Sequence, residues 1–144
     1  MTETVIPSLS RIHHLALTVT DVDVSIAWYR RIFGFNRVAE YRHEGGFGVI
    51  LVLPESNLWI VLHHHDANET EPFNETRTGL DHAGFQVPDL ETLEAWRTRF
   101  AQLGVQHSPI TYNGEFNVSI LVLRDPDNIQ LELFAEHQNT QSST

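Results

Sequence analysis

The 144-residue sequence contains no cysteine. This absence excludes disulfide bonds, thiolate metal sites and cysteine nucleophiles, so any metal would need imidazole and carboxylate ligands. Basic residues are also few, because nine Lys and Arg residues stand against 19 Asp and Glu residues, for a formal net charge of −10. This charge repels phosphate backbones, so we expect no nucleic-acid partner, and a cationic ligand suits the protein better.

Long apolar runs are absent as well. No stretch approaches the roughly 20 apolar residues that a membrane span needs, and the first residues lack the pattern of a secretory leader. We therefore predict a cytoplasmic protein without a membrane partner. The length suits one compact domain over residues 11–136, with an N-terminal extension over 1–10 and a flexible tail over 137–144.

An internal repeat organises the chain. Shifting the sequence by 68 positions superimposes identical residues from its two halves. The matching pairs are His14 and His82, Val19 and Val87, Asp21 and Asp89, Ala27 and Ala95, Trp28 and Trp96, and Arg31 and Arg99. Two copies of so long a period do not make a solenoid, so we predict two half-domains related by a pseudo-twofold axis.

Each copy is predicted to fold as βαβββ. The opening strands are expected at 12–20 and 80–87, and the helices begin after Asp21 and Asp89 and end at Gly34 and Gly104. The remaining strands are expected near 37–42, 47–53 and 58–64, and near 105–112, 116–123 and 129–135. Module one then spans 11–65, a polar connection 66–79 and module two 80–136.

The last predicted strand carries an acidic residue in its middle. Ile129, Leu131 and Leu133 alternate along one face, which leaves Glu132 on the other, together with Gln130. A carboxylate on an inner face is costly to bury unless it is paired or bound to a cation. The sequence therefore predicts a partner for Glu132.

The repeat supplies candidate partners for this carboxylate. His14 and His82 occupy equivalent positions in the two opening strands, and a twofold would bring both towards one axis. An offset of 69 also places His63 on Glu132, so His63 is predicted to be the symmetry mate of the acid. Imidazole and carboxylate ligands suit one divalent ion of Fe, Mn, Ni, Co or Zn.

Three segments resemble one known superfamily. HHLALTVTDVDVSIAWYRRIFGF and GLDHAGFQVPDLETLEAW resemble the module openings of the vicinal oxygen chelate superfamily (glyoxalase, bleomycin resistance protein, extradiol dioxygenase), and RDPDNIQLELF resembles its closing motif. The similarity covers roughly Arg11 to Glu136. It implies an α+β, glyoxalase-like fold in which two βαβββ modules form a partly open mixed-sheet barrel around a cavity. It also implies a homodimer.

The resemblance implies roles for four residues. His14, His82 and Glu132 match the family's metal ligands. Glyoxalase I usually has a glutamate or glutamine ligand where this chain has His63, so His63 is either a fourth ligand or the catalytic acid or base. Strand position, rather than the resemblance, gives the expected wall of the substrate pocket, which consists of Trp59, Tyr112, Phe116, Gln130 and Phe134.

The sequence leaves the reaction open. A divalent ion that binds two neighbouring substrate oxygens suits a lyase or isomerase, whereas Fe(II) with two histidines and a carboxylate suits a ring-cleaving dioxygenase. The alternative is a metal-free small-molecule binding protein of the bleomycin-resistance type, which the charge of −10 favours. The retained histidines and glutamate favour the enzyme.

Overall fold

The computed structural model describes residues 1–2 and 4–138, so most of the predicted tail lies outside the described residues. The first half contains β1 (Leu15–Thr18), α1 (Val22–Phe33), β2 (Asn36–His43), β3 (Gly46–Leu53) and β4 (Leu58–His65). The second half contains β5 (Ala83–Val87), α2 (Leu90–Gln102), β6 (Thr111–Asn113), β7 (Val118–Arg124) and β8 (Gln130–Glu136). The predicted order βαβββ is confirmed in both copies.

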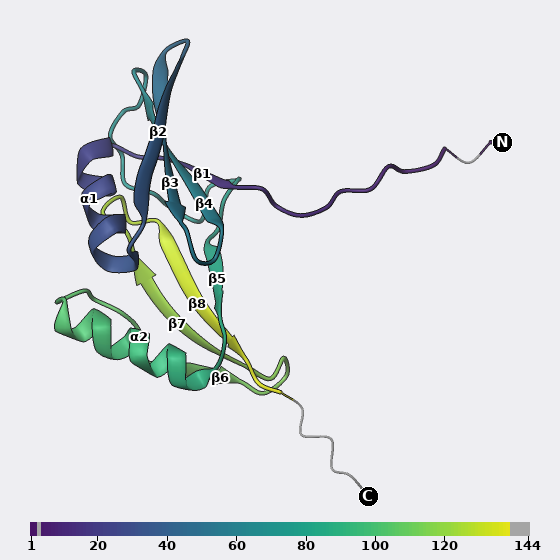
Figure 1. Cartoon of the computed structure of the whole chain (residues 1–144), viewed down its shortest axis with the longest axis vertical. Helices are drawn as coiled ribbons and strands as arrows, with labels where there is room; N and C mark the ends of the chain where they lie inside the picture. The colour runs from purple at the N-terminus through teal and green to yellow at the C-terminus, as the bar shows by residue number, and fades with distance from the viewer. Residues whose placement is uncertain (3, 139–144) are drawn as a thin grey trace, which may run out of the picture.

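The strands form two mixed sheets with the same topology. Their orders are β1-β4-β3-β2 and β5-β8-β7-β6, and in each sheet the opening strand pairs in parallel with the last. Both helices lie on one side of the molecule, and the first residues extend away from it (Figure 1). Among the described residues the ladders do not join the two sheets, so the predicted barrel is open.

The helices begin and end as their sequences predict. The Asp21 carboxylate accepts a hydrogen bond from the backbone N–H of Val24, and the Asp89 carboxylate accepts one from Thr92. Gly34 adopts a left-handed conformation with φ of 84°, which lets its N–H bond to the last turn of α1. Local hydrogen bonds therefore account for both helix starts and for the end of α1.

Three strands are shorter than predicted. β1 and β5 begin at Leu15 and Ala83, so His14 and His82 come directly before the strands rather than inside them. β6 is confined to Thr111–Asn113 instead of 105–112. Pro109 has no N–H to donate, and the Ser108 hydroxyl accepts the N–H of Val122 in place of a ladder partner.

The repeated arginines hold the two helices together. Arg99 donates to the carbonyls of Arg31 and Ile32 at the end of α1, and Arg31 donates to the carbonyl of Leu103 after α2. Each side chain thus satisfies carbonyl groups that the other helix leaves unpaired at its C-terminus. This reciprocal contact gives the sequence identity of Arg31 and Arg99 a structural reason.

The β7–β8 turn joins the two modules. Tyr29 is fully buried, and its hydroxyl donates to Asp125 at 2.9 Å. The Thr20 hydroxyl and N–H both donate to the carboxylate of Asp127. Burial raises the pKa of Asp125 to about 6, although Tyr29 and two backbone N–H groups stabilise its charged form.

Each sheet has a second face that points away from the core, and these faces are available to form a site. Residues of β8 alternate as predicted, with Leu131 and Leu133 buried in the core and Glu132 half-buried on the other face. In β4 the core side chains are Ile60 and Leu62. No helix among the described residues is long and apolar enough to span a membrane.

Candidate functional site

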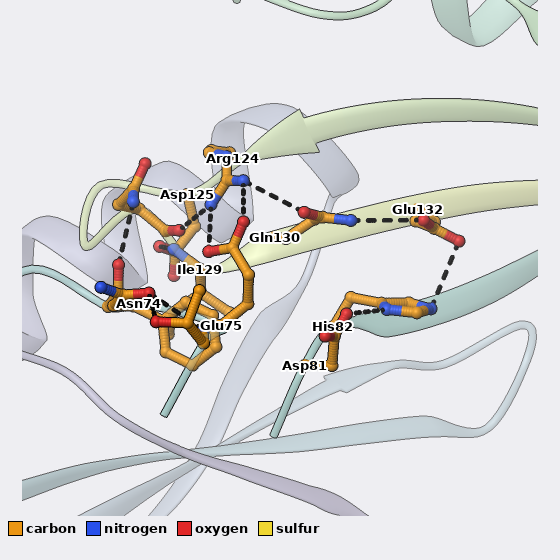
Figure 2. Close-up of polar contacts among 12 residues, drawn as sticks. Asn74, Glu75, Asp81, His82, Arg124, Asp125, Ile129, Gln130 and Glu132 are labelled. Atoms are coloured by element: carbon orange, nitrogen blue, oxygen red, sulfur yellow. Dashed lines mark hydrogen bonds and ion pairs between the residues drawn. The ribbon is translucent and has the colours of Figure 1, made fainter. Parts of the chain in front are cut away.

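Glu132 and His82 face each other across the second sheet. The Glu132 side chain is 14% exposed, and its Oε2 lies 3.4 Å from Nε2 of His82 (Figure 2). Gly84 pairs with Glu132 in the β5–β8 ladder, and a Cβ at Gly84 would meet no atom within 4 Å. The position beside the carboxylate is therefore open.

Asp81 sets the orientation of the His82 ring. Its Oδ1 lies 2.7 Å from Nδ1 of His82, which is the hydrogen bond a carboxylate accepts from a protonated ring nitrogen. In the neutral ring this leaves the lone pair on Nε2, which points at Glu132. The Asp81 hydrogen bond, followed by the charge of Glu132, raises the pKa of His82 against the opposing effect of burial.

A chain of polar contacts holds Glu132 from the other side. Gln130 donates to Oε1 of Glu132 at 3.3 Å and accepts from Arg124 at 3.1 Å (Figure 2). Arg124 also pairs with both carboxylate oxygens of Glu75 in the inter-module connection. The Arg124 hydrogen bonds lower the pKa of Glu75 to about 2. The Arg124 guanidinium is thus paired with groups of the protein itself, although its side chain is 37% exposed.

His14 shares a cavity with His82 but does not touch it directly. A cavity of about 530 Å³ is lined by both histidines and by Trp59, and Nδ1 of His14 lies 3.0 Å from Nδ1 of His13. Since the ligand atoms of His14, His82 and Glu132 are not all within 4.8 Å of one another, the triad is not preassembled. Completing it would require the exposed side chains of His14 and His82 to move.

His63 lies in a different group of side chains. Its Nδ1 is 3.2 Å from Nε2 of His43, and its Nε2 is 2.9 Å from the hydroxyl of Tyr41. Among the described residues, one set of three His, Cys, Asp or Glu side chains has its possible metal-ligand atoms all within 4.8 Å of one another. This set consists of His43, His63 and His65. Burial, followed by His43, His65 and His14, lowers the pKa of His63.

The predicted symmetry between His63 and Glu132 is wrong. The β1–β4 ladder pairs Leu15 with Ile60, and the β5–β8 ladder pairs Ala83 with Leu131. Leu15 and Ala83 are 68 positions apart and Ile60 and Leu131 are 71 apart, so Val61 is the equivalent of Glu132. The offset of 69 matched apolar residues to apolar residues, because it differs from 71 by two positions and leaves the same side chains on each face of the strand. It did not match the register that strand pairing sets.

The predicted pocket residues separate into three places. Trp59 lines the cavity of His14 and His82, Gln130 contacts Glu132, and Phe134 is half-buried on the same strand face as Glu132. Tyr112 and Phe116 are 61% and 69% exposed around β6. The Tyr112 hydroxyl donates to Asn117 there, so these two rings do not join the cavity of His14 and His82.

Three polar residues of these groups were not predicted from the sequence. Asp81 precedes His82 directly, and an acid beside a candidate ligand is a signal that sequence reading could use. His43 and Tyr41 lie on β2. The feature of the sequence that could have pointed to them is the pair Gly46 and Gly48 on the next strand. Their meaning appears only when β2, β3 and β4 are paired.

The donor set fits a divalent metal ion. Asp81 fixes the His82 ring from behind, as carboxylates commonly do for metal-bound histidines. The separation of 3.4 Å between Nε2 of His82 and Oε2 of Glu132 is long for a hydrogen bond, yet close to the roughly 3.3 Å between two ligands of a tetrahedral Zn²⁺. Imidazole and carboxylate ligands without sulfur suit borderline or harder ions.

Comparisons with known proteins agree on the fold. Residues 11–133 match the family described as the Glyoxalase/Bleomycin resistance protein/Dioxygenase superfamily. A glyoxylase/bleomycin resistance protein/dioxygenase domain from Frankia sp. EAN1pec is 38% identical, with a TM-score of 0.81, and the match covers 90% of this chain and 100% of that one. The uncharacterized protein YwkD of Bacillus subtilis is 28% identical, over 89% of this chain and 98% of its own length.

A more distant structure is the fosfomycin resistance protein FosX of Listeria monocytogenes. It is 20% identical with a TM-score of 0.67, and the match covers 94% of this chain and 98% of FosX. That structure, of a single-residue mutant of FosX, contains Mn(II) and 1S,2S-dihydroxypropylphosphonic acid. At this level of identity the likeness concerns the fold.

Proposed function

Because the chain belongs to the Glyoxalase/Bleomycin resistance protein/Dioxygenase superfamily, we propose that it is a divalent-metal-dependent enzyme acting on a small molecule with adjacent oxygen atoms. The observation that carries this proposal is the Asp81–His82–Glu132 arrangement, in which an oriented imidazole faces a half-buried carboxylate. His14 is the proposed third ligand, because it lines the same cavity as His82.

Each residue of this site has a task that its contacts support. A bound divalent ion would act there as a Lewis acid towards two substrate oxygens. Asp81 keeps the His82 lone pair on Nε2, and Gln130 holds the Glu132 carboxylate in place. The Trp59 ring gives the cavity an apolar wall that limits access of water.

The ligand of FosX supports the substrate class. Dihydroxypropylphosphonic acid carries two hydroxyl groups on adjacent carbons, and it occurs there together with Mn(II). We propose the same class, a small molecule with neighbouring oxygens, for this chain. Lyase, isomerase and ring-cleaving dioxygenase reactions are all compatible with this donor set, and Fe, Mn, Ni, Co and Zn with its ligands.

The role of His63 as a catalytic acid or base stays a prediction. Both of its ring nitrogens face neighbours inside the cluster, one towards His43 and the other towards Tyr41. A proton transfer to substrate would require one of these contacts to open. His63→Ala is the direct test, because loss of a general base would lower turnover while leaving the metal at His82 and Glu132.

A metal-free binding protein is the second candidate, favoured by the charge of −10. Such a protein has no need of an imidazole oriented by one carboxylate towards another, so the Asp81–His82–Glu132 arrangement weighs against it. A cytoplasmic location and a homodimer likewise stay predictions. Light scattering on the purified protein would measure the oligomeric state.

Metal analysis of protein purified without an affinity tag tests the proposal. We expect a divalent metal in the wild type and about one equivalent less in His82→Ala, with the folding stability nearly unchanged because His82 is partly exposed. His64→Ala is the matched control, since His64 pairs with Asp66 away from the site. Equal metal content in His82→Ala and the control would remove His82 from the site.

A further inference from the structure

Three imidazoles converge on the first sheet, on the face opposite its core residues. His63 and His65 lie on β4, and His43 lies on β2, two strands away. The ring centroid of His43 lies 5.3 Å from that of His63 and 5.1 Å from that of His65. The centroids of His63 and His65 lie 5.7 Å apart. We propose that these histidines form a second metal site, which takes a divalent ion of borderline softness such as Zn²⁺.

The nitrogen spacing suits such an ion. Nδ1 of His63 and Nε2 of His43 are 3.2 Å apart, close to the roughly 3.3 Å between two ligands of tetrahedral Zn²⁺. His65 brings a third nitrogen within 4.8 Å of both. A modest rotation of its half-exposed ring would close the remaining distance. Three imidazoles leave one coordination position for water or an anionic oxygen.

Two glycines on β3 make room for this convergence. β3 separates β2 from β4, and its Gly46 pairs with both His43 and His65, while Gly48 pairs with both Tyr41 and His63. A Cβ at Gly48 would lie 2.7 Å from the Tyr41 ring. A Cβ at Gly46 would lie 2.9 Å from the His43 ring and would clash with the His64 carbonyl oxygen.

Without those glycines the rings of β2 would not reach β4. Strands two apart in a sheet are separated by about 10 Å, which a side chain can bridge only if the strand between them carries nothing there. The groove over Gly46 and Gly48 is filled by the side chains of Tyr41 and His43. The cluster is therefore built by the sheet rather than formed by histidines that happen to lie at a strand end.

Hydrogen bonds direct the lone pairs of two of these rings. Nδ1 of His43 lies 3.0 Å from the Glu44 carbonyl, which can only accept, so Nδ1 carries the proton and Nε2 keeps its lone pair towards His63. Nε2 of His63 faces the Tyr41 hydroxyl, which can donate or accept. Rotation of that one hydroxyl lets His63 move its proton to Nε2 and offer Nδ1 to a metal.

The second site is separate from the one at His82 and Glu132. His63 pairs with Thr18 at the far end of β1, and His14 precedes the start of that strand, so the backbones at Thr18 and His14 lie about 13 Å apart at roughly 3.3 Å per residue, although the His14 side chain is near enough to lower the pKa of His63. Glu132 lies on β8 of the other sheet, and His82 directly precedes β5 of that sheet. The two sites share no ligand, so this inference does not rest on the proposed function.

Zinc titration of the full-length, tag-free apoprotein tests the second site. The His82→Ala/Glu132→Gln variant removes the first site, and calorimetry with ZnCl₂ should still show one equivalent bound. Adding His43→Ala should weaken that binding at least 100-fold. Adding His64→Ala instead should change it less than twofold, because His64 lies on the same strand but pairs with Asp66. Circular dichroism confirms that each variant is folded.

The outcomes separate the two sites. Absence of Zn²⁺ binding in the His82→Ala/Glu132→Gln variant, or binding that His43→Ala leaves unchanged, would overturn the second site without touching the first. Nitrogen NMR of labelled histidines gives an independent readout. On addition of Zn²⁺, Nδ1 of His63 should lose its proton and Nε2 should gain one, whereas an unchanged tautomer would exclude Nδ1 as a ligand.

Discussion

At the scale of single residues, short polar contacts decide which histidine can do what. His82 has a carboxylate behind it and another in front, so its free lone pair has one direction. His63 has two partners of mixed donor and acceptor character, so its proton can sit on either nitrogen. The same residue type is therefore prepared for different tasks by its neighbours.

We predict that Asp81→Asn lowers the metal affinity of the first site about 10- to 100-fold, as loss of a partner behind a metal-bound histidine commonly does. It should also lower the pKa of His82, because the Asp81 hydrogen bond is the main cause of its rise. Metal titration and histidine NMR measure the two effects. Asp66→Asn, beside His64, is the control, and equal affinities in both variants would contradict the assignment.

We predict that Gly48→Ala disturbs the three-histidine cluster. The new methyl group would meet the Tyr41 ring at 2.7 Å, so Tyr41 must move away from His63. Zinc affinity at the second site should fall at least tenfold in a folded protein, measured by calorimetry. Gly84→Ala is the matched control for that site, because a Cβ there meets nothing within 4 Å and Gly84 lies in the other sheet. Unchanged affinity in Gly48→Ala would show that the cluster tolerates the methyl group.

At the scale of elements, the two modules are joined by one buried and several more exposed polar contacts as well as by apolar packing. Helix α1 reaches the β7–β8 turn through Tyr29 and Asp125, and Arg31 and Arg99 join the helix ends. These contacts determine how the two sheets lie relative to each other. The cavity shared by His14 and His82 depends on that placement.

We predict that Tyr29→Phe lowers the free energy of unfolding by about 1–3 kcal/mol, because it leaves a buried carboxylate oxygen without its donor. Chemical denaturation measures this loss. Tyr112→Phe removes an exposed hydrogen bond and should cost less than about 0.5 kcal/mol. Similar losses in the two variants would mean that the Tyr29 hydroxyl does not support the interface.

Stability should also fall as pH rises through the titration of Asp125. Its pKa is raised from 3.8 to about 6 in the folded state, so folding favours the protonated acid. The contribution of Asp125 to the free energy of unfolding is complete below about pH 4 and is lost by about pH 6. It amounts to about 3 kcal/mol at roughly 1.36 kcal/mol per pKa unit. Denaturation curves at several pH values give the free energy of unfolding of the wild type and of Asp125→Asn. This free energy should change differently with pH in the two proteins over this range, and an equal change would contradict the raised pKa.

At the scale of the whole molecule, the charge of −10 attracts cations to both proposed sites. A metal that binds only the folded state also stabilises it. At roughly 100 times the dissociation constant one site contributes about 2.7 kcal/mol, which corresponds to a rise of roughly 5–10 °C in the unfolding midpoint. The effect should weaken in high salt, because salt screens the net charge.

Thermal unfolding of tag-free protein with and without Zn²⁺ measures this stabilisation. The variant His82→Ala/His43→Ala lacks a ligand in each proposed site and should show little response. A midpoint that does not move in the wild type at saturating Zn²⁺ would mean that neither site binds the ion in the folded protein.

The fold was predictable because its signals are local or repeated. Apolar alternation, capping aspartates and the 68-residue offset predicted both modules in the right order. The site was predictable only in part. Strand parity placed Glu132 on the face away from the core, but its symmetry mate depended on register, and a shift of two residues along β4 changed that mate from His63 to Val61. The contact between His63 and His43 depends on the pairing of β2, β3 and β4.

The sequence by itself determined the module order, the helix ends and the alternation that directs Glu132 away from the core, since these depend on near neighbours along the chain. Tertiary structure decided which distant side chains meet. The Tyr41 and His43 rings reach His63 across two glycines, and Asp125 meets Tyr29 between modules, because strand pairing and helix packing determine these distances and no spacing along the chain encodes them.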